Sequence, residues 1–592
     1  MELMSKIKSL KYLVIGFFIL NLIIKLINIQ TTPPGFTFDE VIYIGEAQSI
    51  VEFSSDLKGD WRPWHLEPSD PYYTELTSTV LTPGFILFPN NPILASKFVP
   101  LLLGSLLPVL LGLIAYKLKS RKSIFIFTTL FATLNPWVFQ FSRMGYDSLF
   151  SISFYSLGFV GLLYLKNWNR LWTLIPFFLG FYQYQGHKVL LLPLVGIIFL
   201  YIYFEEYKLF DVFKKFKKII RDKNILSSLT VLLFSLFLTA VYLIRLPSLS
   251  SGQRISEFSF YDETKIVETV NTQRRLAFDS KLTPIFINKY TVLSKDFVER
   301  LFNSFNLKYL FIEGFKPVDS FTVFDYGFFH IIDSLLIVVG LAYVLKKSKD
   351  NKVLIFLISF ILIGALPNGI RTGSPWITFR GSFVFLGLLL IMGIGIGTFY
   401  DQIKSKYKLI LVLLYLILTT QFYYLYFVRY PITHTNYHGF YERIIASYLK
   451  RVGDNPKAII IPDRADATFN YMITYNKLLT KESHEQVSSA ARSGHYEINN
   501  IKMYGGCPTN IADISTDTSI FVYLFKEPCV PNQNLETKTE IKSLIDSGTI
   551  FTVYNDNLCS QYNLGRYPNI KKNIMNVEKL SDQEFCESFF SK

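Results

Sequence analysis

Eleven apolar blocks, each of 14 to 24 residues, constrain this sequence more than any other feature. A helix needs roughly 20 apolar residues to cross the hydrocarbon core of a bilayer. The blocks lack the alternation of barrel strands, and only helices and closed barrels satisfy the backbone inside lipid. The sequence therefore predicts a polytopic α-helical membrane protein. The expected spans are 10–29, 93–116, 123–141, 147–165, 171–186, 189–204, 225–245, 326–345, 353–366, 381–400 and 409–427.

Basic residues gather in every second loop between these blocks. The formal net charge of +14 would suggest nucleic-acid binding in a soluble protein. Here the positive-inside rule accounts for it, because cytoplasmic loops carry an excess of Lys and Arg. We therefore expect no nucleic-acid partner, a location in the plasma membrane and a cytoplasmic N-terminus. The loops expected in the cytoplasm are 117–122, 205–224 and 401–408, and those expected outside are 30–92, 246–325 and all residues after 428.

The last part of the chain, residues 430–592, differs in character from the apolar part, residues 1–429. It is polar, and it mixes short β-rich runs (KAIIIP, SIFVYLF, TIFTVYN) with stretches expected to be helical (YERIIASYLKR, TEIKSLIDS). Such a mixture predicts a small C-terminal α/β domain. The alternation of basic loops places this domain on the extracytoplasmic side.

All four cysteines fall in the C-terminal domain, and none falls in a span. An even number in an extracytoplasmic domain predicts two disulfides, with three possible pairings. Four free thiols in a reducing compartment are the alternative. The spacing does not resemble a zinc ribbon. The cysteines are Cys507, Cys529, Cys559 and Cys586.

Two acidic residues, Asp39 and Glu40, follow the first span by about ten residues and belong to the first outer loop, 30–92. Apolar residues then recur at helical spacing, which predicts an amphipathic helix lying on the membrane. Thr37 and Glu40 fit the capping-box pattern at its start, and carboxylates are favourable at a helix N-terminus. Capping therefore competes with catalysis as the role of these acids.

Further ionisable residues fall at the expected outer ends of spans. Arg143 and Asp147 lie between the third and fourth spans, where ionisable groups are costly and often functional. An ion pair that closes the helical hairpin is the alternative there. His187, Lys188 and Arg380 lie on outer loops. Cations at the interface suit a lipid phosphate, although they also anchor helices by extending to the headgroups.

Three segments together resemble the dolichyl-phosphate-mannose–protein mannosyltransferase family and its bacterial relatives, including the lipid A aminoarabinose transferases. The first is the Asp39-Glu40 pair, and the second is the stretch NPWVFQFSRMGYD, which ends at Asp147. The resemblance covers roughly residues 10–445, and the rest of the chain matches only loosely. The third segment has a Tyr-Pro–aromatic–Gly–Glu pattern and consists of Tyr430, Pro431, Tyr437, Gly439 and Glu442.

The resemblance implies the C-type fold of membrane glycosyltransferases. It implies transfer of a sugar from a polyprenyl-phosphate donor to an acceptor at the outer face, without a nucleotide sugar. Asp39 would be the catalytic base, Glu40 would support it, and Asp147 would be a second acid near the reacting centre. Some relatives bind a divalent metal, but this sequence shows no ligand set for one, and no other cofactor is expected. The cations expected at the donor phosphate are Lys188, His187, Arg380 and Arg143.

A carboxylate base is sufficient for such a transfer. An acceptor hydroxyl is a poor nucleophile near neutral pH, and a positioned carboxylate takes its proton as the new bond forms. A lipid phosphate leaves without protonation, unlike the leaving group of a glycosidase, and cations stabilise its developing charge. One base and one displacement predict inversion at the anomeric carbon. The acceptor is expected to be a protein, a glycolipid or a cell-surface polymer.

A transporter or flippase and a non-catalytic membrane scaffold are the alternative functions. Transport requires ionisable residues along a path through the spans, and the spans contain few, of which Lys25 and Asp333 are examples. No internal repeat of the kind found in many transporters is evident. A scaffold would not need acids and cations on one face. Glycosyl transfer is therefore the favoured hypothesis.

Overall fold

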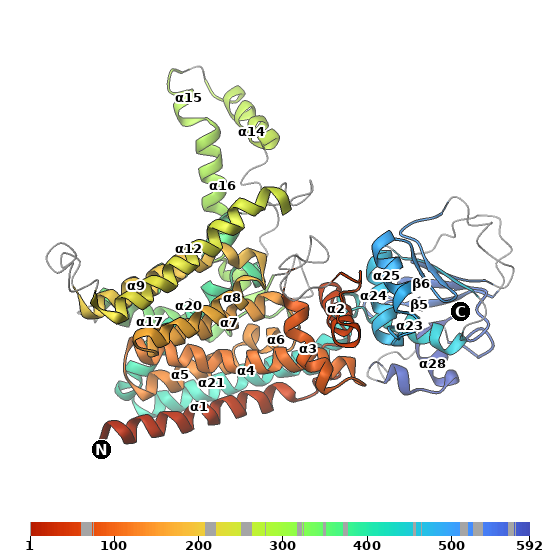
Figure 1. Ribbon diagram of the computed structural model, residues 1–592, viewed down its shortest axis with the longest axis horizontal. Helices are drawn as coiled ribbons and strands as arrows, with labels where there is room; N and C mark the ends of the chain where they lie inside the picture. Colours follow the sequence, from red (N-terminus) through yellow and green to blue (C-terminus); the bar gives the residue numbers. More distant parts are fainter. Residues whose placement is uncertain are drawn as a thin grey trace.

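A computed structural model of the chain places a long bundle of helices at one end and a domain with a β-sheet at the other (Figure 1). The N-terminus lies at the end of the bundle farthest from the C-terminal domain. The structure describes residues 2–60, 74, 76–207, 221–249, 263–278, 280–315, 322–323, 325–346, 351–370, 377–453, 457–462, 464–508, 519–524, 537–565, 574 and 576–592.

Every apolar block predicted as a span contains a helix. In the part of the chain that the structure describes, seven helices are long and apolar enough to cross a membrane. The prediction of a polytopic α-helical membrane protein is confirmed. The helices of the eleven blocks are α1 (Glu2–Leu26), α4 (Pro92–Leu118), α5 (Lys122–Leu134), α7 (Asp147–Tyr164), α8 (Leu174–Phe181), α9 (Leu191–Glu206), α12 (Lys223–Leu249), α17 (Ile331–Lys346), α18 (Asn351–Ile370), α20 (Ser382–Phe399) and α21 (Ser405–Tyr424).

The predicted span 123–141 is wrong as a single helix. It holds α5 and then a separate helix, α6 (Pro136–Phe141), because Pro136 has no N–H to continue the helical hydrogen-bond ladder. The Asn135 side chain caps the new helix by accepting a hydrogen bond from the Val138 N–H at 3.0 Å. The break places α6 directly before the loop that leads into α7.

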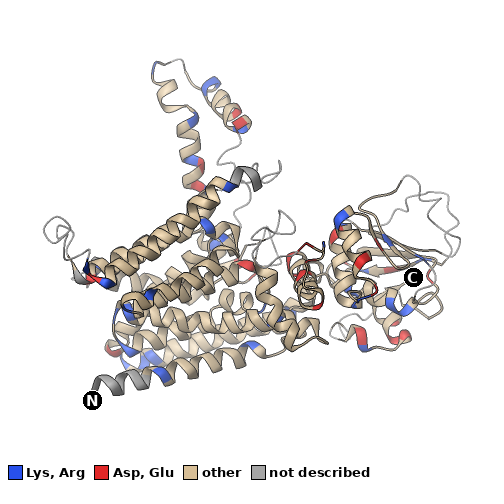
Figure 2. Cartoon of the chain, viewed as in Figure 1, with Lys and Arg blue, Asp and Glu red and all other residues tan. Residues whose placement is uncertain are grey.

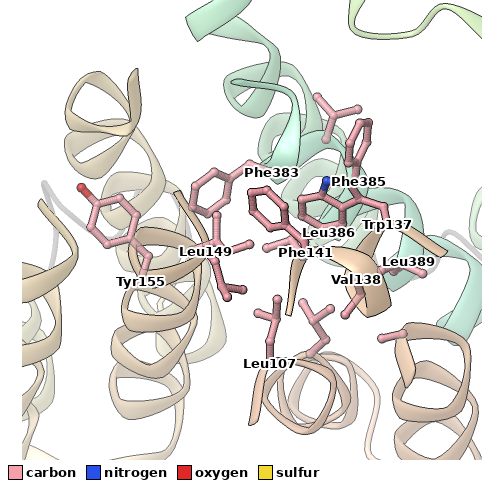
Figure 3. Packing of buried hydrophobic residues seen from close by; sticks show 14 of the residues in the cluster. Leu107, Trp137, Val138, Phe141, Leu149, Tyr155, Phe383, Phe385, Leu386 and Leu389 are labelled. Carbon is pink, nitrogen blue, oxygen red and sulfur yellow. The ribbon is translucent and has the colours of Figure 1, made fainter. Parts of the chain in front are cut away.

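The core of the bundle is built from large apolar side chains of α4, α6, α7 and α20 (Figure 3). The Trp137 ring of α6 stacks on Phe141 at 5.1 Å between centroids and meets the edge of Phe385 of α20 at 5.0 Å. Small residues let α20 approach its neighbours closely. A Cβ at Gly393 would overlap Thr128 of α5. The core is therefore fixed by shape as well as by apolarity.

Two helices lie between the bundle and the C-terminal domain: α2 (Phe38–Phe53) and α3 (Thr77–Leu87) (Figure 1). α2 is the helix predicted in the first outer loop, but the expectation that it lies on the membrane is wrong. Residues 40–47 are all buried, because α2 packs against α3 and against α24 (Ala465–Asn476) of the C-terminal domain. A helix held on both sides can position side chains accurately.

The C-terminal domain is a mixed sheet with helices against it, which confirms the predicted small α/β domain. In the described residues the strand order is β2-β3-β1-β4-β6-β5-β7. β1 pairs in parallel with β3 and β4, and the other neighbours are antiparallel. The elements are β1 (Ala458–Ile461), β2 (Tyr496–Ile498), β3 (Ile501–Met503), β4 (Ile520–Leu524), β5 (Thr539–Lys542), β6 (Thr549–Tyr554), β7 (Phe590–Ser591), α23 (Phe440–Val452), α25 (His484–Ser493) and α28 (Asp582–Phe589), together with α24.

One of the two stretches expected to be helical in this domain is a strand. YERIIASYLKR forms α23 as predicted, whereas TEIKSLIDS begins with β5 and continues into a turn. The first four residues of that stretch alternate between buried and half-buried, with Ile541 fully buried, which is the period of a strand. The segment forms a strand because β5 pairs with β6 on one side and with β7 on the other.

The cysteines of the described residues are all oxidised. Cys559, after β6, forms a disulfide with Cys586 of α28, with 5.1 Å between the Cα atoms. Cys507 is also disulfide-bonded. Cys529 lies outside the described residues. The Cys559–Cys586 bond ties the last helix of the chain to the central part of the sheet.

A helical hairpin projects sideways from the bundle (green in Figure 1). It consists of α14 (Glu263–Arg275), α15 (Thr283–Phe286) and α16 (Lys289–Asn303). Ile266, Val270 and Val292 are buried between α14 and α16 and hold them together. The hairpin belongs to the loop 246–325 that the sequence places outside the membrane.

Candidate active site

Glu40 is a fully bonded residue that joins three parts of the structure. Its Oε1 accepts hydrogen bonds from Lys97 Nζ of α4 at 2.5 Å and from the Gly145 N–H at 2.7 Å. Its Oε2 accepts one from the Thr37 N–H at 3.0 Å, which caps the start of α2. Glu40 and Lys97 are each 1% exposed. This ion pair therefore fixes the position of the first turn of α2.

Asp39, the adjacent residue, has the opposite surroundings. Its side chain is exposed, yet burial by the surrounding protein raises its pKa from the ordinary 3.8 to about 6. Arg464 lowers this pKa and Glu40 raises it. The Asp39 carboxylate is therefore open to solvent and is still partly desolvated by the protein around it. Because the folded pKa is raised, the carboxylate form prevails only above about pH 6, and the contribution of this group to stability falls as the pH rises through that value.

The C-terminal domain binds the segment that precedes Asp39 through hydrogen bonds. Arg443 Nη1 donates to the Pro34 carbonyl oxygen at 3.0 Å, and the Tyr471 hydroxyl donates to the Phe36 carbonyl oxygen at 2.9 Å. Arg443 is itself held by Glu578 through two hydrogen bonds at 2.6 and 2.7 Å. These contacts make the C-terminal domain one wall of the candidate site.

Side chains of the C-terminal domain also surround the acids themselves. The Arg464 guanidinium lies 3.8 Å from the centre of the Phe38 ring, directly beside Asp39. Burial raises the pKa of Tyr471, and the carboxylates of Glu442, Glu40 and Asp39 raise it further. Burial raises the pKa of Glu442 to about 7. Charged groups of α2 and of the C-terminal domain therefore lie close to one another around Asp39.

Asp147 opens α7 and is linked to α2. The Tyr43 hydroxyl of α2 donates to Asp147 Oδ2 at 3.2 Å, and Thr74 Oγ1 donates to the Tyr43 hydroxyl at 3.2 Å. Thr74 and Thr77 are 2.6 Å apart at their hydroxyl oxygens. Thr77 then donates to Gln183 Oε1 at 2.9 Å. This chain of polar contacts runs from the second acid to the loop directly before the expected donor-phosphate residues.

His187 and Lys188 are buried in the 3-10 helix η2 (Gln185–Leu190). His187 Nε2 lies 3.1 Å from the Phe379 carbonyl oxygen and 2.9 Å from Ser382 Oγ. Lys188 Nζ lies over three aromatic rings at 5.0 to 5.6 Å from their centroids, the rings of Phe181, Tyr182 and Tyr242. Cation–π contacts of this kind attract an ammonium group to the faces of the rings.

Arg380 is brought to the same region by the short helix α19 (Ile377–Arg380), and it is 3% exposed. The preceding residue, Phe379, connects the two halves of the site. Its ring centre lies 5.0 Å from that of Tyr146, next to Asp147, and 6.2 Å from that of Tyr184, next to η2. Phe379 therefore packs against the residue before Asp147 and against a residue next to η2.

Arg143 has a different environment from the other cations. Its guanidinium donates to the Lys25 carbonyl oxygen at 2.5 Å, to the Thr32 carbonyl oxygen at 2.8 Å and to the Tyr426 hydroxyl at 3.2 Å. It is fully buried against aromatic rings. These bonds join the end of α1 to the helix that follows α21, so Arg143 organises the backbone on which α2 begins.

Lys97 and Arg464 are the residues of the site that the sequence reasoning missed. Lys97 carried a signal, because an ionisable group inside a span, here in the second turn of α4, is costly unless paired. Arg464 carried none, because it enters from a domain far along the chain. In the described ranges no group of three or more His, Cys, Asp or Glu side chains is placed to hold a metal ion.

Solved structures overlap this chain over most of its length. The archaeal oligosaccharyltransferase AglB from Archaeoglobus fulgidus, in complex with an inhibitory peptide and a dolichol-phosphate, matches with a TM-score of 0.45 and 11% identity, over 87% of this chain and 69% of that chain. ArnT from Cupriavidus metallidurans bound to undecaprenyl phosphate matches with a TM-score of 0.44 and 10% identity, over 92% and 98%. The first of these is an oligosaccharyltransferase, and the two structures hold a dolichol-phosphate and an undecaprenyl phosphate, respectively. No family model and no curated protein matches the chain.

Proposed function

We propose that the chain transfers a sugar from a polyprenyl-phosphate donor to an acceptor hydroxyl, with Asp39 as the base. The observation that carries the proposal is the contrast between two adjacent acids. Glu40 is buried and fully bonded, whereas Asp39 is exposed and has a pKa raised to about 6. A carboxylate with that pKa is ionised at neutral pH and is a stronger base than an ordinary aspartate.

In the proposed step, the Asp39 carboxylate takes the proton of the acceptor hydroxyl while the acceptor oxygen bonds to the anomeric carbon. The bond from that carbon to the phosphate oxygen breaks, and the polyprenyl phosphate leaves with the bonding electrons. Attack opposite the leaving group inverts the anomeric carbon. Lys188 and Arg380 hold the donor phosphate and stabilise its charge, while Asp147 lies near the reacting centre.

His187 and Arg143 are assigned to positioning in this scheme. His187 bonds to the backbone of Phe379, the residue before Arg380, so it sets where that cation lies. Arg143 holds the end of α1 against the segment that leads to α2. This scheme uses no metal ion.

Transport is less consistent with the buried charges of the spans. Lys25 Nζ donates to the Gly104 carbonyl oxygen of α4 at 2.6 Å, and Asp333 Oδ2 accepts from the His330 N–H at 3.0 Å. Both side chains are fully buried. They hold neighbouring backbone rather than line a path, so their role is structural.

We expect the C-terminal domain and the candidate site to face outside, since the basic residues of the bundle gather at the opposite end, near the N-terminus (Figure 2). Cysteine variants at exposed Ser405, the first residue of α21, and at exposed Ser547, in the C-terminal domain, test this in intact cells. An impermeant maleimide should label only Ser547→Cys. Labelling of Ser405→Cys alone would show that the orientation is the reverse of the one expected.

The reaction itself is tested with purified protein and polyprenyl-phosphate sugars. We expect release of polyprenyl phosphate that depends on an added acceptor. Peptide, glycolipid and cell-wall polymer acceptors are supplied separately, so that the class of acceptor is identified by which of them supports release. If no combination of acceptor and donor sugar gives release, the transferase proposal is contradicted, and measured solute flux in proteoliposomes would favour transport.

Lys188→Met is expected to weaken donor binding by about 1.5–3 kcal/mol, the usual cost of losing a hydrogen bond to a charged group. Methionine keeps the length of the side chain and its contacts with the aromatic cage, so the loss reports the charge. The matched control is Lys408→Met, which also removes a lysine stacked on a tyrosine, Tyr400 at 4.3 Å, but at the other end of the bundle. Equal donor affinity in both variants would show that Lys188 is an interfacial anchor and does not bind the donor phosphate.

Arg464→Gln is expected to move the rising limb of the pH–rate profile to higher pH. Arg464 lowers the pKa of Asp39, so its removal makes the base form appear later as the pH rises. Arg451→Gln is the control, because Arg451 belongs to the same domain but pairs with Asp582 at 2.6 Å. If the rising limb of the pH–rate profile stays at the same pH in Arg464→Gln, the assignment of Asp39 as the base is contradicted.

A further inference from the structure

The end of the hairpin formed by α14, α15 and α16 is apolar and uncovered. Phe278 is 97% exposed and Leu276 is 80% exposed, values unusual for side chains of this size in a folded chain. Contiguous apolar surface of this kind marks a site of contact with a protein or a membrane. The exposed apolar residues of the hairpin end are Leu276, Phe278, Leu282, Ile285, Phe286 and Tyr290.

Basic residues accompany this apolar surface. Arg274, Arg275, Lys281 and Lys289 are all exposed, and residues 274–290 contain one acidic residue, Asp279. Aromatic and aliphatic side chains with Lys and Arg around them form the composition of segments that lie in the headgroup region of a bilayer. The charge also selects among lipids, because anionic headgroups attract Lys and Arg near the surface.

The hairpin is attached to the end of the bundle that carries the candidate site. Arg300 Nε of α16 donates to the Gly369 carbonyl oxygen at 3.2 Å, and Asn368 Nδ2 donates to Ser304 Oγ at 2.7 Å. Asn368 and Gly369 lie in the last turn of α18, shortly before Arg380 in the chain. From this attachment the hairpin extends sideways, away from both the bundle and the C-terminal domain (Figure 1).

We propose that the hairpin lies on the bilayer surface at the C-terminal-domain end of the bundle, with its apolar side chains among the acyl chains and its basic residues on anionic phospholipid headgroups. A segment that leaves a span end sideways meets lipid before any other partner. Charge complementarity selects the anionic headgroup. The hairpin then restrains the end of α18 and the segment that leads to Arg380.

The first test measures the depth of the hairpin end in the full chain. A spin label is placed at Phe286→Cys in nanodiscs that contain phosphatidylcholine and phosphatidylglycerol. Collisions with oxygen should exceed those with a water-soluble nickel chelate. The control label at Ile545→Cys, an exposed position of the C-terminal domain, should give the reverse order. A Phe286 label as open to nickel as the Ile545 label would overturn the proposal, as would a protein cross-linked at Phe286 in native membranes.

The second test concerns the charges. The preference for phosphatidylglycerol over phosphatidylcholine near the Phe286 label should fall at least about tenfold when four basic residues are replaced together, since each contributes several-fold. The variant is Arg274→Gln/Arg275→Gln/Lys281→Gln/Lys289→Gln. Lys404→Gln/Lys406→Gln, at the opposite end of the bundle, should leave that preference unchanged. An unchanged preference in the hairpin variant would overturn the assignment of anionic lipid. Neither test depends on sugar transfer, so both can succeed if the proposed function fails.

Discussion

Asp39→Asn is expected to lower the rate of sugar transfer by about 10²–10⁴-fold, while folding and donor binding stay intact. Asparagine keeps the shape of the side chain but cannot accept a proton. It caps a helix as well as aspartate does, so a purely structural role for Asp39 would leave the rate nearly normal. The measurement is single-turnover transfer by the purified variant at saturating donor.

Two features of that experiment separate the catalytic role from a general disturbance of the site. The pH–rate profile of the unchanged protein should rise through about pH 6, the pKa to which Asp39 is raised, and the residual rate of the variant should lack this limb. Glu485→Gln, at an exposed position of α25, removes a carboxylate of the same charge far along the chain. It should change neither the transfer rate nor the pH at which the rate rises. A variant within a few-fold of normal would make Asp147 the next candidate base.

Lys97→Met is expected to destabilise the protein by about 3–5 kcal/mol, because it leaves the Glu40 carboxylate buried without its cation. Glu40 and Lys97 are each 1% exposed, so water cannot replace the lost partner. Denaturant unfolding in detergent, followed by tryptophan fluorescence, measures the loss. Lys117→Met is the control, since the pair of Lys117 and Glu205 is partly exposed and such pairs contribute about 0–1 kcal/mol.

The double variant Lys97→Met/Glu40→Gln distinguishes the buried charge from the loss of packing. Removing both charges should recover much of the stability, because replacing a buried pair by neutral groups is often nearly neutral. After the Glu40→Gln change, the single amide oxygen can accept from only one of the two donors, the Thr37 N–H or the Gly145 N–H, which bind different oxygens of Glu40, so the recovery should be partial. A double variant as unstable as Lys97→Met would show that the lysine stem, and not the charge, holds α2.

The bundle was predictable because apolar blocks of span length leave few other structures open to a chain in lipid. The errors occurred where a local pattern competed with a distant contact. The stretch TEIKSLIDS has helical composition, but β6 and β7 pair with its first half. α2 has the pattern of a surface helix, but α3 and α24 cover it. Neither partner is visible in the local sequence.

The candidate site was predictable in part. The sequence left capping and catalysis open for the two acids, and the structure divides these roles: Glu40 caps and pairs, while Asp39 stays exposed. The sequence also singled out Asp147, Lys188 and Arg380, whose roles remain predictions. It missed the partner of Glu40, because an ion pair across 57 residues leaves no trace in local spacing.

The way in which the C-terminal domain holds the first outer loop has a consequence for how such chains diversify. Arg443 and Tyr471 bind the carbonyl oxygens of Pro34 and Phe36, atoms that every residue type provides. The two hydrogen bonds therefore do not depend on which side chains positions 34 and 36 carry, although the Phe36 ring is itself fully buried. A C-terminal domain that keeps an arginine and a tyrosine in these places makes the same two contacts, so it can hold the start of α2 in the same position while the rest of its surface varies.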